Sequence, residues 1–489
     1  MSLKQRSIYG LFWEFAGRIG LQSVGFIVSI ILARILAPED FGLLAIINVF
    51  IALAGVFLDF GFSKALIQRA EVNETHYAAV FYLNVSMGLI LAAGTFFLAP
   101  IVGAFYNKEI LVNLTRFMAL GFIVNSLGNV IRARLRREMN FKIISVVNVA
   151  AAFFSGVIAI VMAWKGFGVW SLAVQSVANQ LMANVMLYFF YPVPLSLGFR
   201  WQGLKDLWGF SSRMFASGFI DTLFINLDSL LIGKLLTPAT LGYYHRAKSL
   251  ERFTFRYTAA TLASVLLPSL SSLQNEPERL RHAVLKVFHL LSFISFLSSG
   301  LLLVSSREII ILLFSAKWEP SVIMFQIIIA GAFGPQIFSL FYNVLLSTGR
   351  ANQYFLINLT QKTLLGLNLA MLFFWSLTYY LVAFSAVRIF ILYVTMIIVS
   401  KQLNFGSKLV RISARHLSIF AFGTAAVFLI KGQLDLSNLL VSLLFSSGLF
   451  AILFIVLTCL FNKETFQAAI QELFLPVKAK IQALTAKSF

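Results

Sequence analysis

Long apolar runs separated by short polar connections make up most of the chain. Many of these runs reach the roughly 20 residues that an α-helix needs to cross a lipid bilayer. The pattern predicts an all-α polytopic membrane protein with about fourteen transmembrane helices. Their expected ranges are 12–36, 43–66, 77–99, 110–131, 143–164, 168–190, 212–236, 241–266, 284–305, 321–346, 354–376, 378–401, 412–431 and 438–461.

Polar residues inside these runs recur at helical spacing. Glu14 and Arg18 are four residues apart, and Asp221 and Asp228 are seven apart, so each pair shares one face of its helix. Because charge within a bilayer is costly, such residues normally face a polar cavity or a partner. The stripes concentrate on the first, second, seventh and eighth predicted helices, which favours a water-accessible cavity between two lobes.

The charges in these helices suggest two roles. Cations outnumber carboxylates, which suits a phosphate or pyrophosphate ligand. The predicted substrate-binding residues are Arg18, Arg116, Arg246, Arg252, Arg256 and Lys362, and the predicted ion-coupling or cavity carboxylates are Glu14, Asp59, Asp221 and Asp228. The alternative is structural pairing of Glu14 with Arg18, Lys248 with Glu251, or Arg252 with Asp228.

One motif occurs twice. Arg34, Pro38 and Gly42 recur 200 residues later as Lys234, Pro238 and Gly242, each time between two apolar runs. A unit used twice within a membrane chain is typical of alternating-access transporters. We therefore expect lobes at 1–200 and 201–405, followed at 406–489 by two further helices and a cytoplasmic tail.

Two local features carry narrower expectations. Pro335 lies within the predicted span 321–346 and removes a backbone hydrogen bond, so it is either a hinge for rocking or a static kink. In the tail, Phe466, Ile470, Leu473 and Phe474 share one helical face. That arrangement predicts an amphipathic helix on the membrane surface.

Composition and charge agree with a membrane protein. At 59% hydrophobic and 12% charged residues, the chain could not stay soluble as a monomer. With an even number of spans, 24 Lys and Arg residues fall on the side of the termini and 7 on the other. This bias places both termini in the cytoplasm. The net charge of +20 is spread between spans, so nucleic-acid binding is not expected.

Soluble-enzyme signatures are absent from the sequence. It contains neither a GxxxxGK[ST] phosphate loop nor an HExxH metal motif, and its one cysteine, Cys459, lies in an apolar run. We therefore expect no metal site and no cofactor, although H⁺ or Na⁺ could be the coupling ion.

Several short stretches resemble bacterial polysaccharide exporters. They are 30–42, 59–62, 266–270, 314–318 and 346–350. In this order and spacing they are similar to the O-antigen, colanic-acid or teichuronic-acid flippase group of the multidrug/oligosaccharidyl-lipid/polysaccharide (MOP) superfamily. The resemblance covers nearly the whole chain.

The resemblance implies two six-helix bundles in a V around a central cavity, with two extra helices. It implies a multi-pass protein of the bacterial inner membrane that turns an undecaprenyl-pyrophosphate-linked oligosaccharide over to the periplasmic leaflet, for lipopolysaccharide or another surface polysaccharide. Related lipid II flippases hold pyrophosphate with basic residues of the first helix, where Arg18 lies. The expected partners are this substrate and membrane lipids; we expect a monomer that could associate with the polysaccharide polymerase machinery.

Other functions fit less well. A multidrug or cation antiporter of the same superfamily should present an acidic cavity, whereas cations are in excess here. A membrane glycosyltransferase or polymerase would normally need a sizeable outer loop with catalytic residues, and the predicted outer loops are short. If the protein were a scaffold without transport activity, nothing would explain why it keeps charged residues in the bilayer, where they cost free energy.

Overall fold

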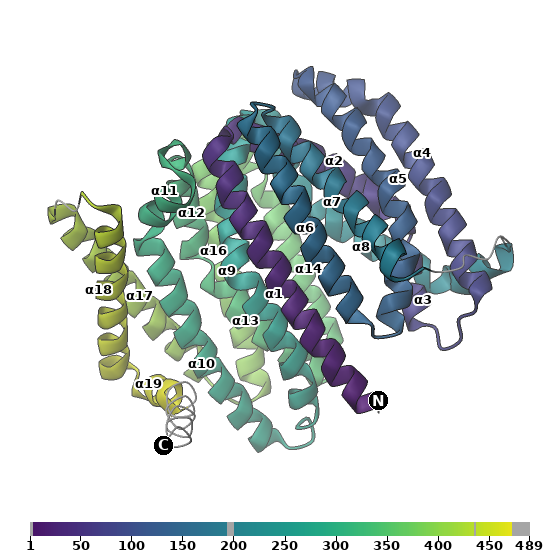
Figure 1. Cartoon of the computed structure of the whole chain (residues 1–489). Coiled ribbons are helices and arrows are strands. Elements are labelled where there is room, and N and C mark those ends of the chain that lie inside the picture. The colour runs from purple at the N-terminus through teal and green to yellow at the C-terminus, as the bar shows by residue number, and fades with distance from the viewer. Residues whose placement is uncertain (1–2, 193–199, 435–436, 472–489) are drawn as a thin grey trace, which may run out of the picture. The chain divides into compact units, whose positions relative to one another are not determined.

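The computed structural model of the chain describes residues 3–192, 200–434 and 437–471. All regular elements in these ranges are helices, as the apolar pattern predicts (Figure 1). The chain divides into two compact units, residues 1–245 and 246–489, each described separately below. This division does not test the predicted lobes, whose boundary near residue 200 stays a prediction.

The described residues of the first unit, 3–192 and 200–245, form eight helices and the beginning of a ninth. They are α1 (Leu3–Ile35), α2 (Pro38–Asp59), α3 (Phe62–Gln68), α4 (Glu74–Tyr106), α5 (Ile110–Arg137), α6 (Phe141–Trp164), α7 (Val169–Phe190), α8 (Trp201–Leu235) and α9 (Pro238–Ser271), which continues into the second unit. Helix α1 runs beside α6, and α6 packs on α7, while α4 packs along α5 (Figure 1). Helix α8 joins this unit through α2, α3 and α4.

The second unit begins at Arg246, within α9. Its further elements are α10 (Pro277–Val304), α11 (Ser306–Phe314), the 3₁₀ helix η1 (Ala316–Trp318), α12 (Ser321–Ala330), α13 (Phe333–Ser347), α14 (Ala351–Asn368), α15 (Met371–Phe374), α16 (Leu377–Gln402), α17 (Lys408–Gln433), α18 (Leu439–Phe461) and α19 (Lys463–Ala469). Helix α10 is central here, since it contacts α12, α13, α17, α18 and α19. Its Phe296 stacks on Phe333 of α13 with ring centroids 4.2 Å apart, and both side chains are fully buried.

The long helices carry apolar side chains on their outer faces as well as in the cores. Phe97 is 76% exposed, Phe189 79% and Leu429 71%. Such faces would be unstable in water but suit lipid tails. Eleven helical segments of the described residues are long and apolar enough to cross a membrane.

All fourteen predicted spans fall on helices, but three of these helices, α7, α9 and α14, are not among the eleven. The helical class is confirmed, and the count of fourteen stays a prediction.

Three predicted spans are interrupted, the eleventh, 354–376, at Leu369 and Ala370 between α14 and α15. The second, 43–66, breaks at Phe60 and Gly61, whose φ values of 47° and 80° place both residues in the left-handed region.

The tenth predicted span, 321–346, breaks at Gly331 and Ala332 between α12 and α13. Pro335 lies in the first turn of α13, and the interruption at Gly331 lies four residues before it, where the proline ring would obstruct the carbonyl of a continuous helix. The span is therefore interrupted where the static kink was expected. The role of Pro335 as a hinge stays a prediction.

The predicted amphipathic tail is partly described. Helix α19 begins directly after α18, and Phe466 and Ile470 are half-buried along it. Thr465 and Ala469 are the buried residues of this helix, which packs on α10. Leu473 and Phe474 lie outside the described residues.

Candidate substrate-binding site

The two copies of the repeated motif meet in the first unit, where α2 and α9 begin. Pro38 and Pro238 each occupy the first helical position, where a fixed φ suits the helix. Each start is capped, since Asp40 accepts a hydrogen bond from the backbone N–H of Ala37 at 3.0 Å and Thr237 Oγ1 accepts one from that of Thr240 at 3.2 Å. Both starts thus share the proline and a side chain–backbone hydrogen bond, but the side chain comes from the third helical residue in α2 and from the residue before the helix in α9.

The glycines of the repeat allow these two starts to cross at backbone contact. A Cβ on Gly42 would overlap the carbonyl oxygen of Pro238, and a Cβ on Gly242 would overlap that of Pro38. The contact is reciprocal, as expected where a two-fold pseudo-symmetry axis passes between repeats. Glycine is required because neither carbonyl can move aside as a flexible side chain could.

A cavity of about 540 Å³ lies beside this crossing. Its charged lining residues are Lys108, Lys234 and Glu39, of which Lys108 and Glu39 form an ion pair at 3.1 Å. Lys234 donates to the carbonyl of Phe105, and its Nζ lies 4.5 Å from the centre of the Phe105 ring. The cavity therefore has a mixed polar and cationic lining at the ends of the helices.

Asp228 is the most enclosed of the predicted carboxylates in this unit. It is 7% exposed and accepts a hydrogen bond from the Tyr244 hydroxyl at 2.5 Å. The Ser229 hydroxyl donates to the same carboxylate at 3.2 Å, and Ser229 Oγ lies 3.2 Å from Nε2 of His245. A short relay of exchangeable protons thus links Asp228 to His245.

Asp59 has a local structural role that its position in sequence did not reveal. As the last residue of α2, it accepts hydrogen bonds from the backbone N–H and hydroxyl of Ser63, at 3.0 and 2.6 Å. Asn84 of α4 donates a third at 3.3 Å. A carboxylate at this point stabilises the start of α3 through its unpaired N–H groups. By contrast, Asp221 is exposed on α8.

The predicted cations of the first unit are not gathered at one point. Arg18 pairs with Glu14 at 2.7 Å, one of the structural pairings foreseen, and its side chain remains 59% exposed. Arg116 of α5 lies over the ring of Phe96, 4.7 Å from its centre. Its Nε is buried without a hydrogen-bond partner among the described residues. Arg116 therefore keeps donor capacity that an anion could satisfy.

In the second unit, Arg246 is held among aromatic rings. It is 5% exposed, and its guanidinium carbon lies 4.5 Å from the centre of the Phe314 ring and 4.7 Å from that of Trp318. Ring faces attract a desolvated cation and hold its orientation. Trp318 is itself fully buried, so α11 and η1 provide a rigid wall for this arginine.

The remaining predicted cations of this unit are Arg252, Arg256 and Lys362. Arg252 Nε donates to the carbonyl of Lys248 at 3.4 Å and is half-buried. Lys362 is half-buried on α14. The side chain of Arg256 lies outside the described residues, although its backbone belongs to α9.

Two buried ion pairs were not predicted as pairs. Arg388 of α16 donates to Glu251 of α9 at 2.5 Å, and their side chains are 9% and 11% exposed. The sequence placed Arg388 in a span and suggested Lys248 for Glu251. Only a fold that brings α16 beside α9 could reveal the actual partner.

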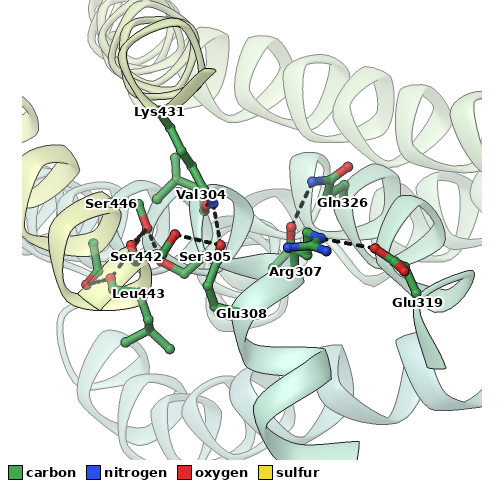
Figure 2. Close-up of polar contacts among 12 residues, drawn as sticks. Val304, Ser305, Arg307, Glu308, Glu319, Gln326, Lys431, Ser442, Leu443 and Ser446 are labelled. Carbon is green, nitrogen blue, oxygen red and sulfur yellow. Dashed lines mark hydrogen bonds and ion pairs between the residues drawn. The ribbon is translucent and has the colours of Figure 1, made fainter. Parts of the chain in front are cut away.

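The second pair, Glu308 and Lys431, fastens the end of α17 to α11 (Figure 2). Lys431 Nζ lies 2.7 Å from Glu308 and also donates to the carbonyl of Val304 at 3.3 Å. Ser442 of α18 donates to the same carboxylate at 2.9 Å. Burial raises the pKa of Glu308, but the hydrogen bonds from Lys431 and Ser442 outweigh it, so the pKa lies below its ordinary value.

Glu308 was not predicted as a buried residue because it lies in a short segment between two predicted spans. Its side chain is only 2% exposed, and a nearby acid–base pair, Arg307 and Glu319, is more than half exposed. An acidic residue directly after an apolar run was the only signal available in the sequence. No group of three or more His, Cys, Asp or Glu residues in the described ranges could hold a metal ion.

Comparison with known proteins identifies the family. A family model described as polysaccharide biosynthesis protein matches residues 31–323, more than half of the chain. The chain belongs to this family. The match begins at the first copy of the repeated motif and continues through the second.

Two relatives of this family member are 25% and 27% identical to it. The lipopolysaccharide biosynthesis protein WzxC of Escherichia coli strain K12 is 25% identical over 334 residues, 67% of this chain and 67% of WzxC. The succinoglycan biosynthesis transport protein ExoT of Rhizobium meliloti is 27% identical over 274 residues, 56% of this chain and 55% of ExoT.

Solved structures share the fold over nearly the whole chain. The lipid II flippase MurJ in an inward closed conformation has a TM-score of 0.69 at 12% identity, covering 92% of this chain and 99% of that one. An inward-facing MATE-family multidrug transporter of the MOP superfamily has a TM-score of 0.61 at 14% identity, covering 80% and 96%. The expected exporter family and MOP fold are confirmed. This chain is thus a member of the polysaccharide biosynthesis family, with eleven helical segments in its described part that are long and apolar enough to cross a membrane.

Proposed function

We propose that this protein moves an undecaprenyl-pyrophosphate-linked oligosaccharide from the cytoplasmic to the periplasmic leaflet of the bacterial inner membrane. The observation that carries the proposal is the family match through both copies of the repeat, on a fold shared with a lipid II flippase. The glycan would serve a surface polysaccharide, as the names of WzxC and ExoT indicate for those relatives.

The arginines of the chain have the chemistry needed to carry a pyrophosphate headgroup across a bilayer. A sugar–pyrophosphate headgroup cannot enter hydrocarbon unaided, because its polar groups would lose water without replacement. Arginines bind phosphate oxygens through charge-assisted, often paired hydrogen bonds. Arg116 has a buried donor without a partner among the described residues, and Arg246 is oriented by aromatic rings. Arg18, Arg252, Arg256 and Lys362 would contact the pyrophosphate at other stages of its passage, while the polyprenyl tail stays in lipid.

Transport would follow alternating access of the two repeats. The crossing of Gly42 over Pro238 and Gly242 over Pro38 supplies a close contact at which repeats could pivot. Asp59, Asp221 and Asp228, and Glu14 where it is released from Arg18, would exchange H⁺ or Na⁺ as the lobes rock. Both termini would lie in the cytoplasm, following the positive-inside bias.

An experiment in cells tests the proposal. Membranes from bacteria with and without the gene are sealed as right-side-out and inside-out vesicles and treated with an impermeant glycosidase. The proposal expects loss of the protein to move lipid-linked oligosaccharide from the right-side-out accessible pool to the inside-out pool. An unchanged distribution, with the glycan still synthesised, would contradict it.

A further inference from the structure

A cationic pocket lies at the ends of α17 and α18, where α19 begins. Its volume is about 620 Å³, and all its lining residues belong to the second unit. Figure 1 shows α19 at the lower end of α18. The basic-residue bias places these helix ends on the cytoplasmic side. The pocket therefore lies at the predicted boundary between lipid and cytoplasm.

The charge of this pocket is strongly positive. Lys408, Arg411, Arg415 and Lys463 line it, against the single carboxylate Glu464. Glu464 pairs with Lys408 at 3.0 Å, and this hydrogen bond lowers the pKa of the carboxyl. Among the described residues, Glu464 is the carboxylate nearest this group: it pairs with Lys408, and the charge of Arg415 also lowers its pKa. Four cations thus line the pocket against one carboxylate in the described part of the chain, which leaves a net positive charge.

The pocket also has an apolar border. Leu460 and Phe461, at the end of α18, line it and are 61% and 62% exposed. Above them Arg411 is exposed, and its guanidinium donates to Ser407 Oγ at 3.2 Å. A ligand that fits this surface has an anionic group that contacts the arginines and apolar chains that pack on Leu460 and Phe461 of α18.

We propose that this pocket binds the phosphate headgroup of an anionic phospholipid of the cytoplasmic leaflet, with its acyl chains along Leu460 and Phe461. A free phosphate would use the cations but not the apolar border, which is why the lipid is favoured. The bound lipid supplies the counter-charge that the described residues lack. It also bridges α17 and α19, since Arg415 and Lys463 come from these two helices.

Native mass spectrometry of the full-length protein in detergent, titrated with phosphatidylglycerol or phosphatidylcholine, tests this site. The variant Arg411→Gln/Arg415→Gln removes two charges from the pocket. The matched control Arg279→Gln/Arg350→Gln removes two exposed charges of the same unit that do not line it. We expect the pocket variant to bind phosphatidylglycerol about tenfold or more weakly than wild type, the change given by losing about 1.4 kcal/mol of charge-assisted contacts. The control should bind like wild type.

Three outcomes would overturn the proposal. Equal phosphatidylglycerol binding by wild type and pocket variant would show that the arginines do not hold the lipid. Equal binding of phosphatidylglycerol and phosphatidylcholine by wild type would show no preference for an anionic headgroup. Displacement of the lipid by millimolar inorganic phosphate would assign the pocket to a soluble anion. If the double variant does not fold, Arg415→Gln alone is measured, with the same expected direction. The readout is lipid binding, so it does not depend on the transport proposal.

Discussion

Gly42 and Gly242, 200 residues apart in sequence, each lie against the carbonyl of the proline that begins the other's helix. The repeated motif is thus a structural contact as well as a recurring pattern. Because both glycines pack on backbone, any side chain at either position would push α2 and α9 apart. The contact therefore holds the starts of α2 and α9 at backbone distance.

The first prediction concerns this crossing. Gly42→Ala should lower the Tm of the purified protein in detergent, because the new methyl group overlaps the Pro238 carbonyl. Overpacking of this kind costs about 1–3 kcal/mol. Gly94→Ala is the control, since a Cβ there has nothing within 4 Å and alanine favours the α4 helix. Equal melting of the two variants would show that the crossing is not tightly packed.

The second prediction concerns the buried pair Glu308–Lys431. Glu308→Gln should destabilise the protein by about 3 kcal/mol, because it leaves the Lys431 ammonium largely buried without its counter-charge. The double variant Glu308→Gln/Lys431→Met should recover most of this loss. Thermal melts in detergent provide the measurement.

The exposed pair beside it offers a control. Glu319→Gln breaks a 3.0 Å ion pair with Arg307 that is more than half exposed, and should change stability by less than about 1 kcal/mol (Figure 2). Equal losses for Glu308→Gln and Glu319→Gln would show that burial adds nothing to the first pair.

The third prediction is a pH dependence. The pKa of Glu308 lies below its ordinary value of 4.5, so the folded state favours the ionised carboxyl more than the unfolded state does. Its contribution is complete above about pH 5 and is lost as pH falls through the lowered pKa. The difference in Tm between wild type and Glu308→Gln should therefore shrink below pH 4.5. A difference that stays constant from pH 7 to pH 3 would contradict this assignment.

The fourth prediction concerns ion coupling. Replacing Asp59, Asp221 and Asp228 together by asparagine should abolish the dependence of transport on an H⁺ or Na⁺ gradient. Single variants identify the residue, and Asp59→Asn should also lower stability because Ser63 and Asn84 lose a carboxylate acceptor. Glu109→Gln, an exposed site between α4 and α5, is the control. Gradient dependence that survives in the triple variant would exclude these carboxylates.

Hydropathy and the repeat were enough to predict much of the fold. Uninterrupted apolar runs predict helices directly, because a backbone in lipid must satisfy its own hydrogen bonds. The break at Gly61 was not predicted, since apolar residues continue on both sides of it, whereas Pro335 indicated an interruption near Gly331. A local backbone conformation, rather than polarity, ends these helices.

The contacts of each charged side chain were harder to predict than the helices. Arg18 found the partner four residues away, which helical spacing makes visible. The partners of Arg246, Arg388 and Glu308 lie on other helices. Which side chains meet there depends on how the helices pack, which the sequence pattern does not give. Asp59 caps a helix whose start was not predicted.

The most direct test of the transport claim is leaflet exchange by the purified protein in sealed vesicles. The vesicles contain a labelled undecaprenyl-pyrophosphate oligosaccharide, and the label in the outer leaflet is quenched or cleaved over time. We predict rapid exchange with wild type and clearly slower exchange with Arg18→Ala and with Arg252→Ala. No exchange above protein-free vesicles, or equal rates for all three proteins, would contradict a pyrophosphate-binding flippase.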